Sequence, residues 1–483
     1  MTEDSAQGVA SSANRRFWLV VVVLVMAEIT CAFETSMISV ALSKLYGLYG
    51  DPVRVTWLIT AYGLTSAATV AIGSRLGDIY GRRRMLVIML LIATAGSLIS
   101  ALSNDLNIII LGRAIQGASM SVLPLAFGIL REVVEDRKQL NVGVGVLGGT
   151  YSFSTGLGIV LGGVIVDRAD WQDMFLLSAG VAVIALVMVL AVLPRDRPRT
   201  VSGPLDLIGG LTLVIPITAL LLGLNSGKAE GWGSPMTLGL FAGGIVGLGA
   251  WVIYELRQAD PMIDVRLLKI PQIATVNLMI CFCAVGPMIY PQVLMPLLQQ
   301  PLWTGVGLGI TATMAGLVKM PTNLSSGVAG ISSGFLAQRY GMRAVVIWSM
   351  AANLLAWVLL IFFHDSVWSL VLASVLLIAP AGTILFGCAP GLIIEATPED
   401  RTSEATGMTS VLRAISQAVG SQLIALCLAT SLVSNAAGAR FPDEKAYLTT
   451  FIYLTACSAV SLAFAFMIPR NRTAAPPAPA LAG

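Results

Sequence analysis

Long apolar segments, separated by short polar ones, recur along the whole 483-residue chain. A helix needs about 20 mainly apolar residues to cross the hydrocarbon core of a bilayer. Segments of that length predict fourteen membrane-spanning helices, near residues 17–43, 54–74, 84–102, 107–130, 141–166, 173–193, 206–226, 235–255, 272–298, 306–336, 343–363, 367–394, 404–433 and 447–468. The pattern predicts an all-α integral membrane protein.

Composition agrees with this pattern. The chain is 56% hydrophobic and only 11% charged, whereas soluble domains carry about 25% charged residues. If the N-terminus is placed on the cytoplasmic side, most of the 29 Lys and Arg residues fall in cytoplasmic loops and tails, as the positive-inside rule requires. We therefore expect a multi-pass protein of the cell (inner or plasma) membrane with both termini cytoplasmic.

An internal repeat indicates how the spans are grouped. Gly73–Arg83 aligns with Ser333–Arg343 at a shift of 260 residues, and each segment joins the second and third span of a six-span block. This predicts two six-helix bundles from a duplicated ancestor. The expected domains are a cytoplasmic tail (1–16), an N-terminal bundle (17–203), two additional helices (204–257), a C-terminal bundle (258–468) and a disordered cytoplasmic tail (469–483).

Four short motifs occupy this framework. The loop after the second span reads Gly73-x-x-x-Gly77-Asp78-x-x-Gly81-Arg82-Arg83. The other three are Phe33-Glu34-Thr35-Ser-Met-Ile-Ser-Val-Ala41-Leu42, Trp57-Leu-Ile-Thr-Ala-Tyr62 and Leu111-Gly-Arg113-Ala-Ile-Gln116-Gly117, in spans one, two and four. Together they resemble the major facilitator superfamily, specifically its 14-span drug–proton antiporter group. The resemblance covers residues 17–468 and implies the major facilitator fold.

The chain also departs from that group. The glycine-rich antiporter motif of span five keeps Gly158, Gly162 and Gly163, but Ile159 stands where the family has proline and Ser154 replaces a glycine. In the family, the proline kink is associated with antiporter geometry. The departure leaves a proton-coupled or facilitative importer open beside an exporter.

Five ionisable residues fall well within predicted spans: Glu28, Glu34, Arg113, Lys319 and Arg413. Such residues are costly in a bilayer, so they usually face a cavity and serve a function. Glu34 and Arg113 lie at a similar predicted depth, and the resemblance assigns the pair to proton coupling. A static ion pair between spans one and four is the alternative.

Glu28 precedes Glu34 by six residues and therefore lies on another face of the helix. It is either a second proton-coupling residue, an acceptor for a cationic substrate, or a carboxyl neutralised by hydroxyl partners. Lys319 and Arg413 lie in the C-terminal half and can hold an anionic group or balance Glu28. Their alternative is a structural cation whose stem is buried.

The loop after the second span is predicted to be a conformational latch. By the resemblance, Asp78 stabilises the outward-open state through Arg82 and Arg131 and faces a helix N-terminus of the other bundle, near Ser403. An acid at a helix N-terminus gains about 0.3–1 kcal/mol. Gly73, Gly81 and Arg83 complete the latch; the alternative for Asp78 is a solvated loop acid.

Other polar or amphipathic residues are candidates for the substrate pathway. They are Trp57, Tyr62, Gln292 and Asn323, together with Lys319 and Arg413. Helix–helix hydrogen bonding is the alternative role for the polar ones. Pro287, Pro291 and Pro296 predict a kink in the ninth span.

These features favour a proton-coupled secondary transporter that exports lipophilic or cationic small molecules by alternating access, not an enzyme. We expect no metal site and no cofactor beyond the proton gradient. The expected partners are a small-molecule substrate, protons and membrane lipids, with no nucleic acid, and the protein is expected to act as a monomer. A receptor or scaffold is the rival from a different class.

Overall fold

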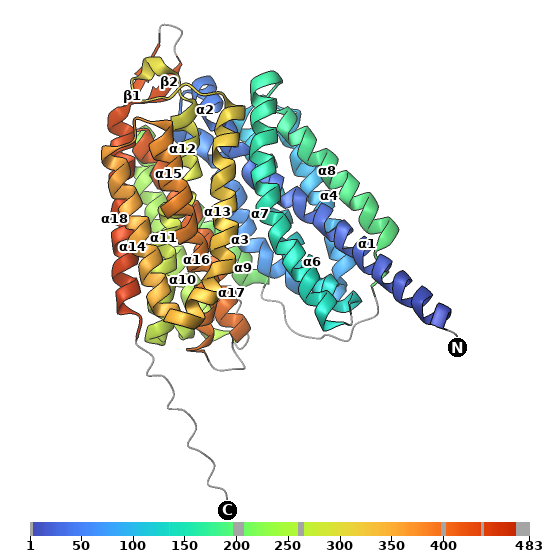
Figure 1. The fold of residues 1–483 in the computed structure, drawn as a ribbon. Coiled ribbons are helices and arrows are strands. Elements are labelled where there is room, and N and C mark those ends of the chain that lie inside the picture. Colours follow the sequence, from blue (N-terminus) through green and yellow to red (C-terminus); the bar gives the residue numbers. More distant parts are fainter. Residues whose placement is uncertain are drawn as a thin grey trace, which may run out of the picture.

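The computed structural model describes residues 3–134, 136–196, 207–258, 265–397, 402–435 and 439–469. Within these ranges the chain is helical except for loops and one antiparallel pair of short strands (Figure 1), β1 (Leu432–Ser434) and β2 (Arg440–Pro442). We call the end of the molecule that carries these strands the hairpin end. The opposite end, where α3 meets α4 at Gly81, is called the Gly81 end.

The N-terminal helices are α1 (Glu3–Ser36), α2 (Ile38–Tyr49), α3 (Pro52–Tyr80), α4 (Arg82–Ala101), α5 (Leu106–Gly117), α6 (Val122–Val133), α7 (Arg137–Arg168) and α8 (Asp173–Val192). The C-terminal helices are α11 (Pro271–Val285), α12 (Pro291–Gln299), α13 (Ala312–Tyr340), α14 (Met342–Phe362), α15 (Val367–Ala373), α16 (Ala379–Ile394), α17 (Thr402–Leu428) and α18 (Glu444–Met467). Between them lie α9 (Leu207–Glu230) and α10 (Pro235–Arg257).

Ten helical stretches of the described residues are long and apolar enough to cross a membrane. Each coincides with a predicted span. The other four predicted spans correspond to α3, α7, α9 and α13, which are also helical. The fold is thus an all-helical membrane architecture, and the count of fourteen spans stays a prediction.

Several predicted spans are interrupted. α11 ends at Val285, a 3₁₀ turn η3 (Pro287–Ile289) follows after Gly286, and α12 begins beyond it, so the predicted kink of the ninth span is confirmed. A 3₁₀ turn η1 (Ala118–Ser121) separates α5 from α6. A π-helical turn η5 (Ser374–Ile378) lies between α15 and α16.

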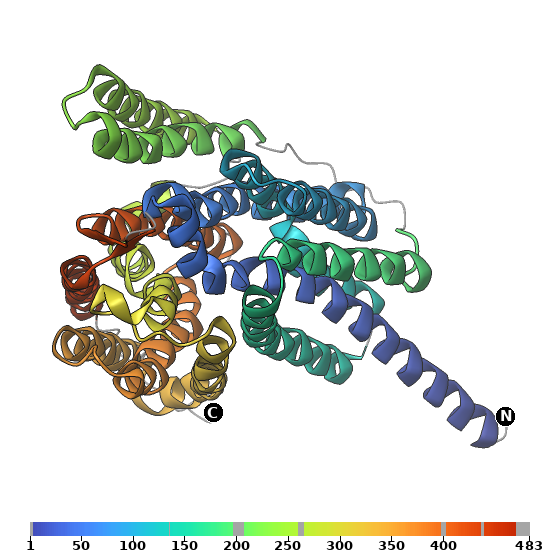
Figure 2. The same cartoon turned by 90° about the horizontal axis from the view of Figure 1, so that it is seen from above.

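The pair α9–α10 lies at the periphery of the molecule (Figure 2). Leu213, Ile217 and Leu221 of α9 share an apolar cluster with Trp57 and Leu64 of α3 and with residues of α11 and α17. The pair therefore packs against both the N-terminal and the C-terminal helices. The predicted domain boundary at 203/204 lies outside the described residues.

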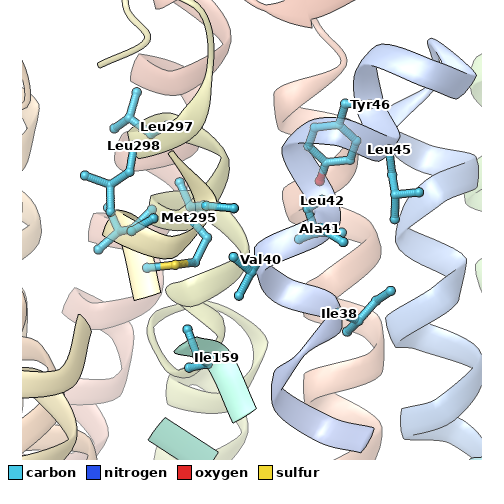
Figure 3. Packing of buried hydrophobic residues seen from close by; sticks show 14 of the residues in the cluster. Ile38, Val40, Ala41, Leu42, Leu45, Tyr46, Ile159, Met295, Leu297 and Leu298 are labelled. Carbon is cyan, nitrogen blue, oxygen red and sulfur yellow. The ribbon is translucent and has the colours of Figure 1, made fainter. Parts of the chain in front are cut away.

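Near the hairpin end, α2 packs against α7 and α12. Figure 3 shows Val40 of α2 and Met295 of α12 pointing toward one another, with Ile159 of α7 below them. All three side chains are buried. Because lipid is as apolar as these side chains, close van der Waals packing holds the helices together here. The N-terminal and C-terminal helices are thereby joined at the hairpin end.

Candidate functional site

Glu34 and Arg113 lie side by side, but the contact differs from a simple ion pair. Arg113 Nη1 donates to the backbone carbonyl of Glu34 at 2.8 Å, not to its carboxylate. Arg113 Nε donates to the Leu58 carbonyl at 2.9 Å, and Nη1 also donates to Gln116 Oε1 at 2.8 Å. Both Glu34 and Arg113 are almost fully buried. The guanidinium is therefore fixed by neutral acceptors beside Glu34.

The Glu34 carboxylate has only one hydrogen-bond partner among the described residues. Ser119 Oγ lies 3.2 Å from Glu34 Oε2, while Glu34 Oε1 is buried without a partner. A buried acceptor without a partner is costly. An added proton would turn this oxygen into a donor and reduce the cost of burying a charge. The carboxylate is thus buried with one oxygen partnered and the other without a partner among the described residues.

The surrounding side chains form one network. Gln116 Nε2 donates to Ser97 Oγ at 2.6 Å, so the amide connects Arg113 to α4. The Arg113 guanidinium lies over the Tyr62 ring, 4.3 Å from its centroid. The Tyr62 hydroxyl lies 3.1 Å from Thr35 Oγ1, one residue from Glu34. Tyr62, predicted as a pathway residue, therefore belongs to the same network as Glu34 and Arg113.

The local backbone makes this network possible. A Cβ on Gly117 would lie 2.1 Å from Thr65 Oγ1 and 2.3 Å from the Tyr62 carbonyl oxygen, so only glycine lets α5 approach α3 here. The η1 turn begins at the next residue and places Ser119 beside Glu34. The glycine of the fourth-span motif thus has a packing role.

Glu28 is also buried, and neither of its carboxylate oxygens has a partner among the described residues. It lies on α1, six residues before Glu34. A buried, unpartnered carboxyl suits either a proton site or an acceptor for a cation. Its role stays a prediction.

At the Gly81 end, the predicted latch loop is a tight connection between α3 and α4. Gly81 has φ +104°, which disfavours other residues, and a Cβ there would overlap the Asp196 carboxylate. Asp196 accepts hydrogen bonds from the backbone N–H groups of Arg83 and Arg84, both at 2.9 Å. Asp196, which follows α8, therefore caps the N-terminus of α4. No sequence motif had pointed to it.

The arginines of this loop have other partners as well. Arg82 Nη1 donates to the Gly128 carbonyl at 2.6 Å and forms an ion pair with Glu132 Oε1 at 3.0 Å. Arg83 donates to the Leu190 carbonyl, and Arg131 is exposed. The side chain of Asp78 lies outside the described residues. Its role as a latch stays a prediction.

Gly73 also allows a close helix approach, in this case between α3 and the η1 turn. A Cβ at this position would lie 2.1 Å from Ser121 Oγ. Ser121 Oγ donates to the Thr69 carbonyl of α3 at 2.9 Å. The first glycine of the loop motif therefore lets the polar η1 turn pack against α3.

A different contact joins the two sets of helices at the hairpin end. Asp167, in the last turn of α7, accepts hydrogen bonds from Ala312 N at 3.0 Å and Thr313 N at 2.7 Å, in the first turn of α13. Burial alone raises the pKa of Asp167, yet hydrogen bonding to the Thr313 side chain, to these two backbone N–H groups and to the Thr311 side chain outweighs it and holds the pKa below its ordinary value. Figure 1 shows α7 and α13 close together at this end and diverging away from it.

Two glutamines add polar contacts across the same boundary. Gln292 Nε2 of α12 lies 3.4 Å from Thr56 Oγ1 of α3 and 3.2 Å from the Ser421 carbonyl. Gln422 Nε2 of α17 donates to Thr60 Oγ1 at 2.9 Å. Gln292, predicted as a pathway residue, thus lies between the N-terminal and C-terminal helices in this conformation.

The other pathway candidates lie in varied surroundings. Trp57 is buried in the apolar cluster beside α9. Asn323 of α13 faces α7, since its Nδ2 lies 2.5 Å from where a Cβ on Gly156 would be. Lys319 is 7% exposed and its Nζ lies 5.4 Å from the Tyr290 ring centroid. The Arg413 guanidinium lies 4.9 Å from the Phe386 ring centroid.

Three residues of the site had no assigned role in the sequence analysis. Gln116 was visible only as part of the fourth-span motif, and Ser119 and Asp167 carried no motif signal. Each acts through a contact between helices distant in sequence. The best available signal was the polar character of Gln116 and Ser119 within an apolar span.

Comparisons with known proteins bear on the family and the fold. The family profile described as Major Facilitator Superfamily matches residues 24–421. Multidrug transporter protein MdtP of Bacillus subtilis is 28% identical over 336 residues, which are 69% of this chain and 60% of MdtP. Multidrug resistance protein 3 of the same species is 26% identical over 353 residues, 73% of this chain and 67% of that protein.

Among solved structures, the nucleoside transporter NupG superposes with a TM-score of 0.68 at 13% sequence identity. The superposition covers 93% of this chain and 100% of NupG. At that identity the likeness shows the fold alone. The match of the family profile over most of the chain, on a fold shared with a solved transporter, shows that this protein belongs to the Major Facilitator Superfamily.

Proposed function

We propose that this membrane transporter is a proton-coupled antiporter that exports lipophilic or cationic small molecules, as a monomer in the cell membrane with both termini cytoplasmic. The observation that carries the proposal is the buried Glu34 carboxylate beside a fixed Arg113. The names of MdtP and multidrug resistance protein 3 support drug export as the direction and cargo. The 14-span antiporter group remains part of the proposal.

The chemistry follows from the hydrogen bonds. Arg113 is held by two backbone carbonyls and an amide, so its position does not depend on the charge of Glu34. Glu34 can therefore take up a proton without losing its neighbour. A proton crossing 100 mV releases about 2.3 kcal/mol, and each pH unit across the membrane adds about 1.4 kcal/mol. This energy can drive cargo movement if protons reach Glu34 from one side of the membrane in one conformation and from the other side in the other conformation.

Alternating access requires contacts that form at one end when they break at the other. The Asp167 contact joins α7 to α13 at the hairpin end in this structure. We propose that the loop at Gly81, with Asp78, forms the corresponding latch in the other state. In both contacts an acid lies at a helix N-terminus. Such a contact is stabilised by about 0.3–1 kcal/mol, which is small enough for it to break and re-form in each transport cycle.

The test uses the full chain reconstituted in vesicles with an imposed pH gradient. We expect Glu34→Gln to fold as the wild type does but to lose proton-driven movement of a fluorescent lipophilic cation, because the glutamine cannot release a proton. Glu255→Gln, in the peripheral helix α10, is the matched control and should transport normally. Wild-type rates and pH dependence in Glu34→Gln would contradict proton coupling at this residue.

An importer is the second candidate, because Ile159 replaces the proline of the antiporter group. α7 continues from Arg137 to Arg168 through this residue, and Ile159 is buried against α2 and α12. Everted vesicles decide the direction. Accumulation of the compound driven by an acidic interior supports export. Uptake of a nutrient by intact cells that is lost on deletion of the protein supports import.

A further inference from the structure

A cavity of about 150 Å³ lies among the C-terminal helices, away from the Glu34 network. Its lining includes Tyr290, Asn353, Ile378, Gly382, Thr383 and Phe386. An apolar cavity of this volume can hold a group the size of benzene. The wall combines two aromatic rings with a few polar side chains, as is typical of small-molecule sites.

Two irregular helices border this cavity. The break between α11 and α12 contributes Pro287 and Tyr290, and the π-helical turn η5 contributes Ile378. Within a membrane, irregular backbone is tolerated where it is buried in protein or lines a cavity, and π-turns often occur at functional sites. Interrupted helices near the middle of the membrane also form the substrate sites of many transporters. The backbone therefore indicates a binding site independently of the side chains.

The polar side chains of the wall supply hydrogen-bond donors. Ser458 Oγ donates to Asn353 Oδ1 at 2.9 Å, which leaves the Asn353 NH₂ group as a donor. The Thr383 hydroxyl donates to the Ala379 carbonyl within its own helix. Among the described residues that line the cavity there is no Asp or Glu. The two aromatic rings of the wall can attract a cation, but Lys319 and Arg413 already lie over them.

Two cations of the C-terminal helices, the buried Lys319 and the partly buried Arg413, lie over the rings of this wall. Lys319 Nζ lies over Tyr290, and the Arg413 guanidinium lies over Phe386. Lys319 also lines a smaller cavity of about 20 Å³, together with Tyr290 and Ser374. Tyr290 and the η5 turn therefore border both cavities. Within the described part of the chain, Lys319 has neither a hydrogen bond nor an ion pair.

A buried ammonium without a counter-ion is unfavourable, and a carboxylate nearby would relieve this. The described residues do not supply one here; the buried acids Glu28 and Glu34 lie on α1, in the N-terminal helices. The charge distribution is therefore asymmetric, with acids in the N-terminal helices and cations beside the C-terminal cavity. An anionic ligand would provide the missing counter-ion.

We propose that Lys319 and the cavity bordered by Tyr290 and Phe386 form a binding site for small organic anions. The aromatic or branched part of the ligand occupies the larger cavity, and its carboxylate or sulfonate lies against Lys319, with Arg413 contributing to the positive field. As a statement about cargo, this rests on the transport function proposed above. It adds an anion subsite to a transporter for lipophilic or cationic compounds.

Binding is tested with the purified full chain in detergent, without any proton gradient. Radiolabelled benzoate is the probe, and its competitors are benzenesulfonate, the neutral benzamide and the cationic benzylamine, which share one ring. We expect benzenesulfonate to displace benzoate and the other two to fail. Lys319→Gln should weaken benzoate binding by about tenfold or more, and Lys319→Arg should retain most of it. Lys445→Gln, an exposed lysine at the start of α18, is the matched control.

A second variant tests the cavity without changing charge. No other atom lies within 4 Å of where a Cβ on Gly382 would be, so Gly382→Leu can fill the space with the fold intact. We expect this variant to lose benzoate binding while Lys319 is unchanged. Absence of benzoate binding to the wild type in the millimolar range, equal competition by benzylamine, or full binding by Lys319→Gln would overturn the anion site.

The two proposals can fail separately. Benzoate binding that depends on Lys319, without proton-driven transport in vesicles, would leave the site standing and overturn the antiporter. Proton-driven transport of a lipophilic cation, with no charge-selective benzoate binding, would leave the antiporter standing and overturn the site.

Discussion

Two buried cations, Arg113 in the N-terminal helices and Lys319 in the C-terminal helices, have opposite surroundings. In the N-terminal helices, Arg113 donates to Leu58, Glu34 and Gln116 and stacks on Tyr62, so its charge is held in a dense network. In the C-terminal helices, Lys319 makes no hydrogen bond or ion pair with the described residues; its Nζ lies over the Tyr290 ring, and the residue lines a small cavity. The comparison teaches that a membrane protein can bury one cation within a network of hydrogen bonds and another beside an aromatic ring and a cavity; the anion site proposed above rests on this difference.

The largest expected effect comes from breaking the N-terminal network. Arg113→Leu removes the hydrogen bonds to the Leu58 and Glu34 carbonyls and leaves the Gln116 amide oxygen without this donor, and each unsatisfied buried group costs about 1–3 kcal/mol. We expect a large fall in thermal stability and complete loss of transport. Thermal unfolding in detergent and vesicle transport measure the two effects.

Lys319→Leu is the comparison for that prediction. Because no described group accepts a hydrogen bond from Lys319, its removal should leave the thermal stability close to that of the wild type. If both variants destabilise the protein equally, the distinction between a framework cation and an available one is wrong.

A second prediction concerns the packing that joins the two sets of helices. A Cβ on Gly163 of α7 would lie 2.5 Å from the Ala312 carbonyl oxygen of α13. Gly163→Leu should therefore force α7 and α13 apart at the hairpin end and abolish most transport, because this end could no longer close. Cysteine-labelling rates at the hairpin end should rise several-fold.

Gly180→Leu, in α8, is the control for this change, since no other atom lies within 4 Å of where a Cβ on Gly180 would be. It should transport and label as the wild type does. Unchanged labelling in Gly163→Leu would show that the close approach is not needed for closure.

A smaller effect is expected at the capping aspartates. Asp167→Asn can replace only one of the two hydrogen bonds to α13, so closure at the hairpin end should weaken by about 0.3–1 kcal/mol. Asp196→Asn, which caps α4 within the N-terminal helices, should lower stability without shifting accessibility between the two ends. Cysteine labelling at the hairpin end and at the Gly81 end distinguishes the two variants. If Asp167→Asn and Asp196→Asn changed the labelling rates equally, the two aspartates would not have different roles.

The pH dependence of the Asp167 contact follows from the sign of its shift. Its pKa is lowered, so the contact is fully present above the ordinary Asp pKa and is lost only as the pH falls through the lowered value. The protection from cysteine labelling that this contact gives the hairpin end should thus not change between roughly pH 5 and 8. This prediction would be wrong if the labelling rate at the hairpin end changed with pH in that range and the change disappeared in Asp167→Asn.

The smallest effect is expected for Ser119→Ala. It removes the partner of Glu34 Oε2, but the Ser119 hydroxyl also donates to the Gln116 carbonyl at 2.7 Å, so only a small part of the strength of a full hydrogen bond to the carboxylate is lost. Folding should be retained, and the pH at which transport is half-maximal should move upward by a fraction of a unit. Ser121→Ala, in the same turn but bonded to α3, should leave that midpoint unchanged.

Much of the fold could be predicted from the sequence because the information is local. Apolar length placed the helices, Gly286 and Pro287 placed the break before α12, and the motifs around Arg113 indicated the family. The π-turn at Ser374–Ile378 also has a local cause: Pro380 follows it and cannot donate a backbone hydrogen bond to the preceding turn.

The candidate site could be predicted only in part. Burial and charge identified Glu34, Arg113 and Lys319, because an ionisable residue in an apolar span is conspicuous in the sequence. The partners of Arg113 could not be predicted, since a backbone carbonyl is present at every residue. The contacts of Asp167 and Asp196 were missed for the same reason: each binds backbone N–H groups of a helix far away in the chain.

The sequence by itself determined that the chain is a helical membrane protein of this superfamily and which spans carry buried charge, because hydropathy and short motifs depend on neighbouring residues. Only the tertiary structure decided that Arg113 binds the backbone of Glu34, that Asp167 joins α7 to α13, and that Lys319 and Arg413 flank the rings of one cavity. These relations depend on how each helix is rotated and positioned against its neighbours. Packing across the whole molecule sets that rotation.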